Sequence, residues 1–227
     1  MSWLRGALLT LIGLNIALMA LNITLYPAFF AQPGALFYLL EPLASLIVYA
    51  VIAFLTTRRI SPQVDVASRV GLLFGLLTGC LWLVNLTLET FTNIGGGAGI
   101  LATAPFLLGG FLLWGVAGVV AAWRTGSIGS GLLAAIWSAM IFALLTIAYG
   151  WTLPLVAQAR LRQQLVNDPD FLRSRWTDLQ AFVLANSFDS GFSHLLGALV
   201  IGLTLGAIGA VAAVWLKGSR QPRSLAA

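Results

Sequence analysis

Six long runs of apolar residues, separated by short polar stretches, dominate the chain. They cover about residues 4–27, 35–56, 70–91, 99–123, 129–155 and 192–216. Each run is long enough to cross the hydrocarbon core of a bilayer as a helix, which takes about 20 residues. Apolar and polar residues do not alternate with the two-residue period of a strand. The pattern therefore predicts an all-α membrane protein with six transmembrane helices, and it disfavours a β-barrel.

The longest hydrophilic stretch, NDPDFLRSRWTDLQ, covers residues 167–180. Asp168 is a good N-cap, and Pro169 suits the first helical position. Beyond them, four apolar residues fall on one helical stripe: Leu172, Trp176, Leu179 and Val183. This spacing predicts an amphipathic helix over about 169–185 that lies along the non-cytoplasmic membrane surface, with Trp176 as its anchor.

Composition supports the membrane assignment. Of the 227 residues, 59% are hydrophobic and only 8% are charged, and the mean hydropathy is +0.96. A soluble domain carries about a quarter charged residues on average, so this chain cannot hide its apolar side chains in one soluble core. We expect a single integral membrane domain over residues 1–227, with the lipid bilayer as its first partner.

Charge predicts the orientation. Six spans place both termini on one side, where eight cations face the single anion Asp65. These cations are Arg5, Arg58, Arg59, Arg69, Arg124, Lys217, Arg220 and Arg223. That side should be cytoplasmic, because cytoplasmic loops are enriched in basic residues. The +5 net charge thus reflects insertion and contact with anionic lipid rather than nucleic-acid binding. Eleven arginines to one lysine suit a GC-rich genome. We expect the chain to lie in the cytoplasmic membrane of a bacterium, with both termini inside.

Similar sequence patterns recur around two turns. Residues 50–79 and 115–139 each contain an apolar helix end, an arginine turn and a helix start rich in small residues. The last helix ends and the first begins in the same manner. These similarities predict three parallel two-helix units, the third of which is split between the two ends of the chain.

Small residues recur at four-residue spacing on two predicted helices. Gly71, Gly75 and Gly79 share one face of the third helix, and Gly202 and Gly206 share one face of the sixth. Such faces let helix backbones approach closely in lipid. Packing within the bundle and a dimerisation face are both open readings, and the first is more common. Other membrane subunits are therefore a second class of expected partner.

Few polar side chains lie within the spans, and most of them fall near the predicted outer boundary. The candidate residues for an outward-facing polar pocket are Glu41, Asn22, Asn85, Glu89 and His194. Ionisable residues in membrane spans are costly and usually mark binding sites or ion pathways. The alternative is that each carboxylate reaches the headgroup layer separately. In that case no shared pocket forms.

The absence of known motifs limits the chemistry. One histidine and one cysteine cannot supply bis-histidine haem ligation, an iron–sulfur cluster or a cysteine-based zinc site. No nucleotide-binding or hydrolase motif occurs. We therefore expect no cofactor, no metal and no enzymatic activity. The leading hypothesis is a structural or accessory membrane subunit, a helix-packing scaffold. The alternative is a small transporter or channel with an outward-facing polar pocket.

Overall fold

The computed structural model describes residues 2–58, 61–92 and 96–219, and these residues form helices without any strand. The six long helices are α1 (Ser2–Leu25), α2 (Ala35–Thr56), α3 (Pro62–Phe91), α4 (Gly96–Thr125), α5 (Ile128–Val156) and α8 (Leu179–Ser219). All six are long and apolar enough to cross a membrane, which confirms the all-helical, six-helix prediction. The described residues also form three short helices: η1 (Pro27–Ala31), α6 (Gln158–Leu165) and α7 (Pro169–Ser174).

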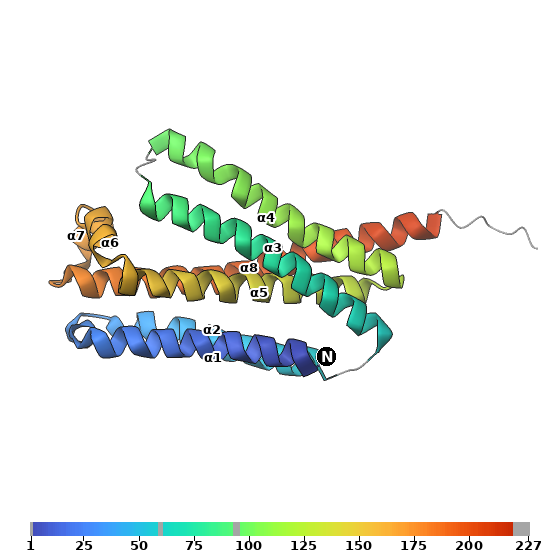
Figure 1. Cartoon of the computed structure of the whole chain (residues 1–227), viewed down its shortest axis with the longest axis horizontal. Coiled ribbons are helices and arrows are strands. Elements are labelled where there is room, and N and C mark those ends of the chain that lie inside the picture. The colour runs from blue at the N-terminus through green and yellow to red at the C-terminus, as the bar shows by residue number, and fades with distance from the viewer. Residues whose placement is uncertain (1, 59–60, 93–95, 220–227) are drawn as a thin grey trace, which may run out of the picture.

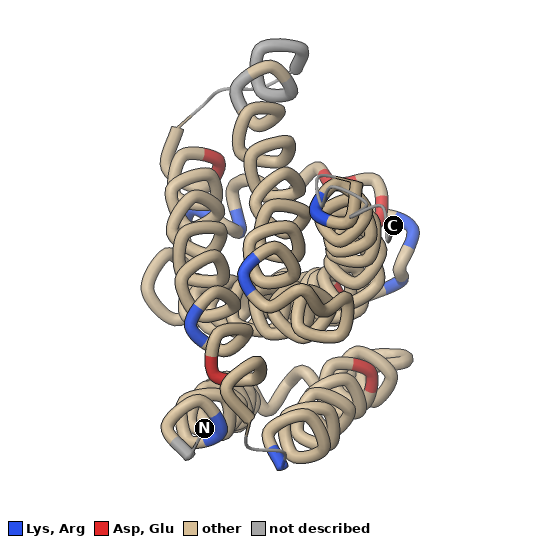
Figure 2. Tube along the Cα trace, turned by 90° about the vertical axis from the view of Figure 1, so that its right-hand side faces the viewer, with Lys and Arg blue, Asp and Glu red and all other residues tan. Residues whose placement is uncertain are grey.

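The long helices run alternately between two ends of the molecule (Figure 1). We call the end that holds the N-terminus the proximal end, and the end that holds α6 and α7 the distal end. Helices α5 and α8 lie at the centre, with the α1/α2 pair on one side and the α3/α4 pair on the other. The view along the helices shows the α1/α2 pair, marked by the N-terminus, set apart from the rest of the bundle (Figure 2). Helix α5 contacts α1, α3, α4 and α8, and it is the most buried helix.

Small side chains allow α5 to take this central position. A Cβ on Gly71 would lie 2.9 Å from the Ala134 carbonyl oxygen, and one on Gly75 would lie 2.9 Å from that of Ser138. On another face of α5, Ala139 packs against Gly202 in the same way, and Ala135 packs against Gly206. Gly79 lies further along the α3 contact, beside Leu145. The predicted glycine faces are therefore covered by α5 of the same chain.

Two asparagines join α1 to α5. The Asn15 side-chain amide donates to the Leu144 carbonyl at 3.0 Å, and the Asn22 amide donates to the Trp151 carbonyl at 2.8 Å. Donors and acceptors are each seven residues apart, so the two helices run parallel and keep a heptad register. Both asparagines are fully buried. Hydrogen bonds thus hold the α1/α2 pair against the centre, where hydrophobicity gives little preference for protein over lipid.

The three sequence-paired units are not confirmed. Helices α2 and α3, which flank the first arginine turn, belong to pairs on opposite sides of the bundle, and α8 packs on α5, α4 and α2 rather than along α1. Only α4 and α5, around the second turn, pack as the repeat predicts. Similar turn sequences mark where helices end, and they do not determine which helices pack together.

The amphipathic helix predicted over 169–185 is not confirmed either. Helix α7 ends at Ser174, and Arg175 adopts the left-handed conformation with φ 63°. The Asp178 carboxylate then accepts from the Gln180 and Ala181 backbone amides at 2.8 and 3.0 Å, which caps the start of α8. The turn at Arg175 and the cap at Asp178 therefore divide residues 169–185 between two helices, α7 and α8. Residues 179–185 consequently belong to a buried part of α8 rather than to a surface helix.

Candidate functional site

The α3/α4 pair diverges from α5 and α8 toward the distal end (Figure 1). In the proximal half, backbone contacts between glycines close the gap between α4 and α8. A Cβ on Gly118 would lie 3.0 Å from the Gly206 Cα, and one on Gly209 would overlap the Gly115 carbonyl. In the distal half, larger side chains separate the same helices, and two adjoining cavities form there. We call them the distal cavity and the aromatic pocket.

The distal cavity has a volume of about 320 Å³ and lies between α3, α5, α6 and α8. Polar side chains make up much of its wall. They are Glu89, Thr90, Thr146, Gln164, Asn186, Ser187, Ser190 and His194. A concave site with several converging polar groups is the usual form of a small-molecule site.

Glu89 is fixed at the rim of this cavity by two neighbours. Its Oε1 accepts from the Asn85 side-chain amide at 2.9 Å and from the Thr103 hydroxyl at 3.0 Å. Asn85 is buried one helical turn below on α3, whereas Thr103 belongs to α4. The carboxylate therefore joins α3 to α4 and gives the rim a negative charge.

Helix α6 forms a wall of the cavity because it covers the end of α3. The last carbonyls of a helix lack intrahelical donors and carry partial negative charge. The Arg160 Nε donates to the Thr90 carbonyl at 3.0 Å, and the Gln164 amide donates to the Glu89 and Thr90 carbonyls at 3.3 and 3.4 Å. This capping places Gln164 over the cavity.

Two residues of α5 that line the cavity, Thr146 and Gly150, lack a regular hydrogen-bond partner for one group each. The Thr146 side chain is 3% exposed, and its buried hydroxyl has no hydrogen-bond partner among the described residues. Pro154 lacks the N–H that would regularly bond the Gly150 carbonyl. Both Thr146 and Gly150 line the distal cavity. A buried polar group without a partner costs about 1–3 kcal/mol, so Thr146 is held here at a cost in stability.

His194 lies between the two cavities and lines both. Its Nδ1 lies 2.7 Å from the Ser190 carbonyl oxygen. A carbonyl oxygen only accepts, so Nδ1 carries a proton in this bond, and Nε2 is the ring nitrogen left for another partner. The ring packs edge-to-face with Trp82, with 5.8 Å between the ring centroids.

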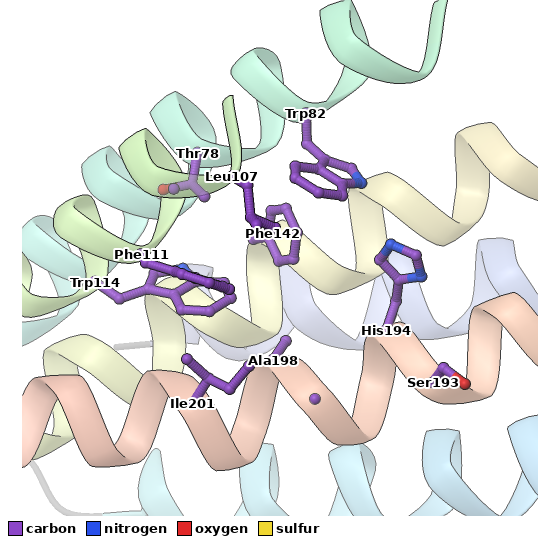
Figure 3. A pocket seen from close by; sticks show the side chains of 12 residues that line it. Thr78, Trp82, Leu107, Phe111, Trp114, Phe142, Ser193, His194, Ala198 and Ile201 are labelled. Atoms are coloured by element: carbon purple, nitrogen blue, oxygen red, sulfur yellow. The ribbon is translucent and has the colours of Figure 1, made fainter. Parts of the chain in front are cut away.

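The aromatic pocket continues from His194 toward the middle of the bundle and has a volume of about 200 Å³ (Figure 3). Phe142 lies between two tryptophans, at ring-centroid distances of 5.9 Å from Trp82 and 5.1 Å from Trp114. Phe111 stacks on Trp114 at 5.8 Å. The indole N–H groups of Trp82 and Trp114 are buried, and neither has an acceptor among the residues that the structure describes.

The structure brings three of the five predicted pocket residues together: Asn85, Glu89 and His194. Glu41 lies elsewhere, beside Tyr49 and Leu195 in a separate cavity between α2 and α8. Asn22 faces α5. Both belong to the α1/α2 pair, which packs on the other side of the bundle from α3 and α4. One pocket with all five residues therefore does not form.

Trp176, the predicted surface anchor, lies inside the protein. It is only 7% exposed and makes edge-to-face contacts with Phe29, Tyr38 and Phe182. These contacts fasten the α7–α8 connection to η1 and α2 at the distal end. A tryptophan in a polar segment can pack inside the protein in this way as well as anchor a helix in lipid.

Sequence reasoning missed Thr146, Trp82 and Trp114. A threonine and two tryptophans within apolar spans read as ordinary helix packing, because most threonines there bond to their own helix. The one usable signal is Pro154, four residues after Gly150, since a proline inside a helix frees the carbonyl at that spacing.

Comparison with models of protein families, with curated proteins and with solved structures finds no match to this chain. The fold defines the class, a protein with six helices suited to span a membrane. The functional argument rests on the geometry of the two adjoining cavities.

Proposed function

We propose that the protein is a membrane-embedded binding protein that takes up an amphipathic ligand at its outer face. The ligand's polar group occupies the distal cavity, and its apolar part extends into the aromatic pocket. The observation that carries this proposal is the distal cavity itself, which eight polar side chains line together, the buried Thr146 among them. A polar ligand group in this cavity can form hydrogen bonds with these side chains.

The packing of the glycines favours binding over a scaffold function. The accessory-subunit hypothesis relies on small-residue faces that are free to receive a partner helix. Here Gly71 and Gly75 pack on α5, and so do Gly202 and Gly206. These faces are therefore used within the chain and offer no groove to a second protein.

Transport is the second candidate, and it requires movement. The distal cavity supplies the outward-facing polar pocket of that hypothesis. Toward the proximal end, however, the close contacts of Gly118 with Gly206 and of Gly71 with Ala134 leave no continuation. Passage across the membrane would require the α3/α4 pair to separate from α5 and α8 along its whole length. Binding needs no such change.

The placement that we propose is a bacterial cytoplasmic membrane with both termini inside. Support comes from basic side chains that cap helices at the proximal end. Arg5 donates to the Thr57 hydroxyl and carbonyl at 2.9 and 3.0 Å, and Lys217 donates to the Trp123 carbonyl at 3.0 Å. In this orientation the distal cavity faces outward, and α7, whose Leu172 is 70% exposed, lies at the outer membrane surface.

A cavity-filling substitution tests the proposal. A Cβ on Gly150 or on Gly13 meets no atom within 4 Å, but only Gly150 lines the distal cavity. The wild type, Gly150→Phe and the control Gly13→Phe are purified from native membranes in mild detergent. Their extracts are then compared by mass spectrometry. We expect a compound that the wild type and Gly13→Phe retain and that Gly150→Phe lacks. Identical extracts from all three proteins would overturn the proposal.

A further inference from the structure

We infer that the polar group bound in the distal cavity is a cation, the protonated amine of an amphipathic ammonium compound, and that the Glu89 carboxylate holds it. This inference rests on the proposed function, because it assigns the chemical class of the ligand that the same cavity takes. Three features of the site carry it: the charge of the cavity wall, the hydrogen-bond acceptors on that wall, and the apolar pocket beside it.

The charge of the wall is negative. Among the described residues, Glu89 is the only Asp, Glu, Lys or Arg that lines the distal cavity. It lies two residues before the end of α3 and is exposed, so a ligand reaches its carboxylate from the outer end. Asn85 and Thr103 both donate to Oε1, and a carboxylate has about four lone-pair sites, so it also accepts from a ligand. Arg160 caps α3 through the Thr90 carbonyl and does not line the cavity.

The hydrogen bonds within the protein use donors of the wall and leave acceptors. The Ser187 hydroxyl donates to the Val183 carbonyl at 2.8 Å, and the Gln164 amide donates to the last carbonyls of α3. The oxygens of both side chains keep lone pairs. Asn186 is exposed and offers a donor and an acceptor, so it does not change the balance. Together with Glu89, these oxygens suit a group with several N–H donors, and an ammonium group has three.

The aromatic pocket determines what is attached to the amine. Its wall is almost wholly apolar, and His194 joins it to the distal cavity. An apolar cavity of about 150 Å³ holds one benzene molecule, so about 200 Å³ takes one ring or a short length of one chain. Leu107 on α4 and Ser193 on α8 line the pocket and are exposed where these helices diverge. A longer chain therefore extends between the two helices into the lipid.

The test compares decylamine with decanol, a neutral probe that has the same chain. An alkylamine, like the lysine side chain, is protonated at neutral pH. Binding to the full-length protein in phosphatidylcholine nanodiscs is measured against empty nanodiscs for the wild type, Glu89→Gln and Glu41→Gln. Glutamine keeps an oxygen that accepts from Asn85 and Thr103 and removes the charge. Glu41 is the matched control, a half-buried carboxylate in the separate cavity between α2 and α8.

We expect the wild type and Glu41→Gln to bind decylamine more tightly than decanol. Glu89→Gln should weaken decylamine binding by at least about fivefold, because the ammonium group loses a charged partner inside a cavity rather than on an open surface. Decanol should bind equally to all three proteins, because the substitution changes the charge of the wall and leaves its shape. The decanol measurement thus separates a lost charge from a distorted cavity.

Two outcomes overturn the inference: equal binding of decylamine and decanol to the wild type, or equal decylamine affinity of Glu89→Gln and Glu41→Gln. Nanodiscs that contain phosphatidylethanolamine separate two sources of the ammonium group. Weaker decylamine binding there assigns it to the phospholipid headgroup, and unchanged binding assigns it to a single-chain amine; both results support an ammonium ligand. If the compound that Gly150→Phe loses has no basic nitrogen, the inference fails and the proposed function stands.

Discussion

At the scale of single residues, buried polar side chains in this protein differ in what surrounds them. Asn15 and Asn22 pair with backbone carbonyls of α5 and stabilise the bundle. The Thr146 hydroxyl has no partner and lines a cavity. These different surroundings cannot be recognised from the residue types in the sequence.

The asparagines give a prediction about stability. Asn22→Leu removes a hydrogen bond that, between membrane helices, is worth about 0.6 kcal/mol on average. It also removes the Asn22 Oδ1, a buried acceptor without a partner. We therefore expect the free energy of unfolding, measured by denaturation in mixed micelles, to fall by less than about 1 kcal/mol. Asn15→Leu should add independently, because seven residues of helix separate the two by about 10 Å. Thr24→Val, at an exposed position, is the control.

At the scale of helices, the close approach of α5 and α8 holds the centre of the bundle together. A Cβ on Gly202 would lie 2.6 Å from the Ala139 Cβ, whereas one on Gly197, on the same helix, meets nothing within 4 Å. Gly202→Ala should lower the free energy of unfolding by about 1–3 kcal/mol through overpacking. Gly197→Ala should leave it unchanged or slightly raise it. Equal effects of the two substitutions would contradict the packing described for α8.

The sequence predicts helices well and their partners poorly. Six spans follow directly from hydropathy, yet α3 begins at Pro62 rather than near residue 70, because the Ser61 hydroxyl accepts from the Val64 amide and caps a polar first turn. Asp178 does the same for α8. These starts carry capping signals that an apolar pattern overlooks. Hydropathy also cannot identify helix partners, because in lipid the faces that pack and the faces that meet acyl chains are equally apolar.

The candidate site was predictable only within one helix. Asn85 and Glu89 are four residues apart, so their contact follows from helical geometry alone. Whether Glu41 joins them depends on the side of the bundle on which α2 packs, and no local pattern determines that. The orphaned hydroxyl of Thr146 depends on the surroundings as well, since other threonines such as Thr152 bond to their own helix.

At the scale of the whole molecule, the protein is a wedge. Glycine and alanine contacts close the proximal half, and aromatic and polar side chains hold the distal half open around two adjoining cavities. This architecture explains why the polar residues of α3, α5, α6 and α8 gather at one end. It also gives a ligand two routes, from the water outside and from the surrounding lipid.

The most direct test of this account measures whether water reaches Thr146, which lies ten residues, or about 15 Å, from the distal end of α5. In a Cys80→Ala background, Thr146→Cys and Ser138→Cys are exposed to a small, charged, membrane-impermeant thiol reagent outside intact cells. Ser138 is the matched control, a fully buried and unpartnered hydroxyl on the same helix that lines neither cavity. The account predicts that Thr146→Cys is labelled and that Ser138→Cys is not. Equal protection of both cysteines, or labelling of Thr146→Cys only after the cells are opened, would contradict an outward-facing distal cavity.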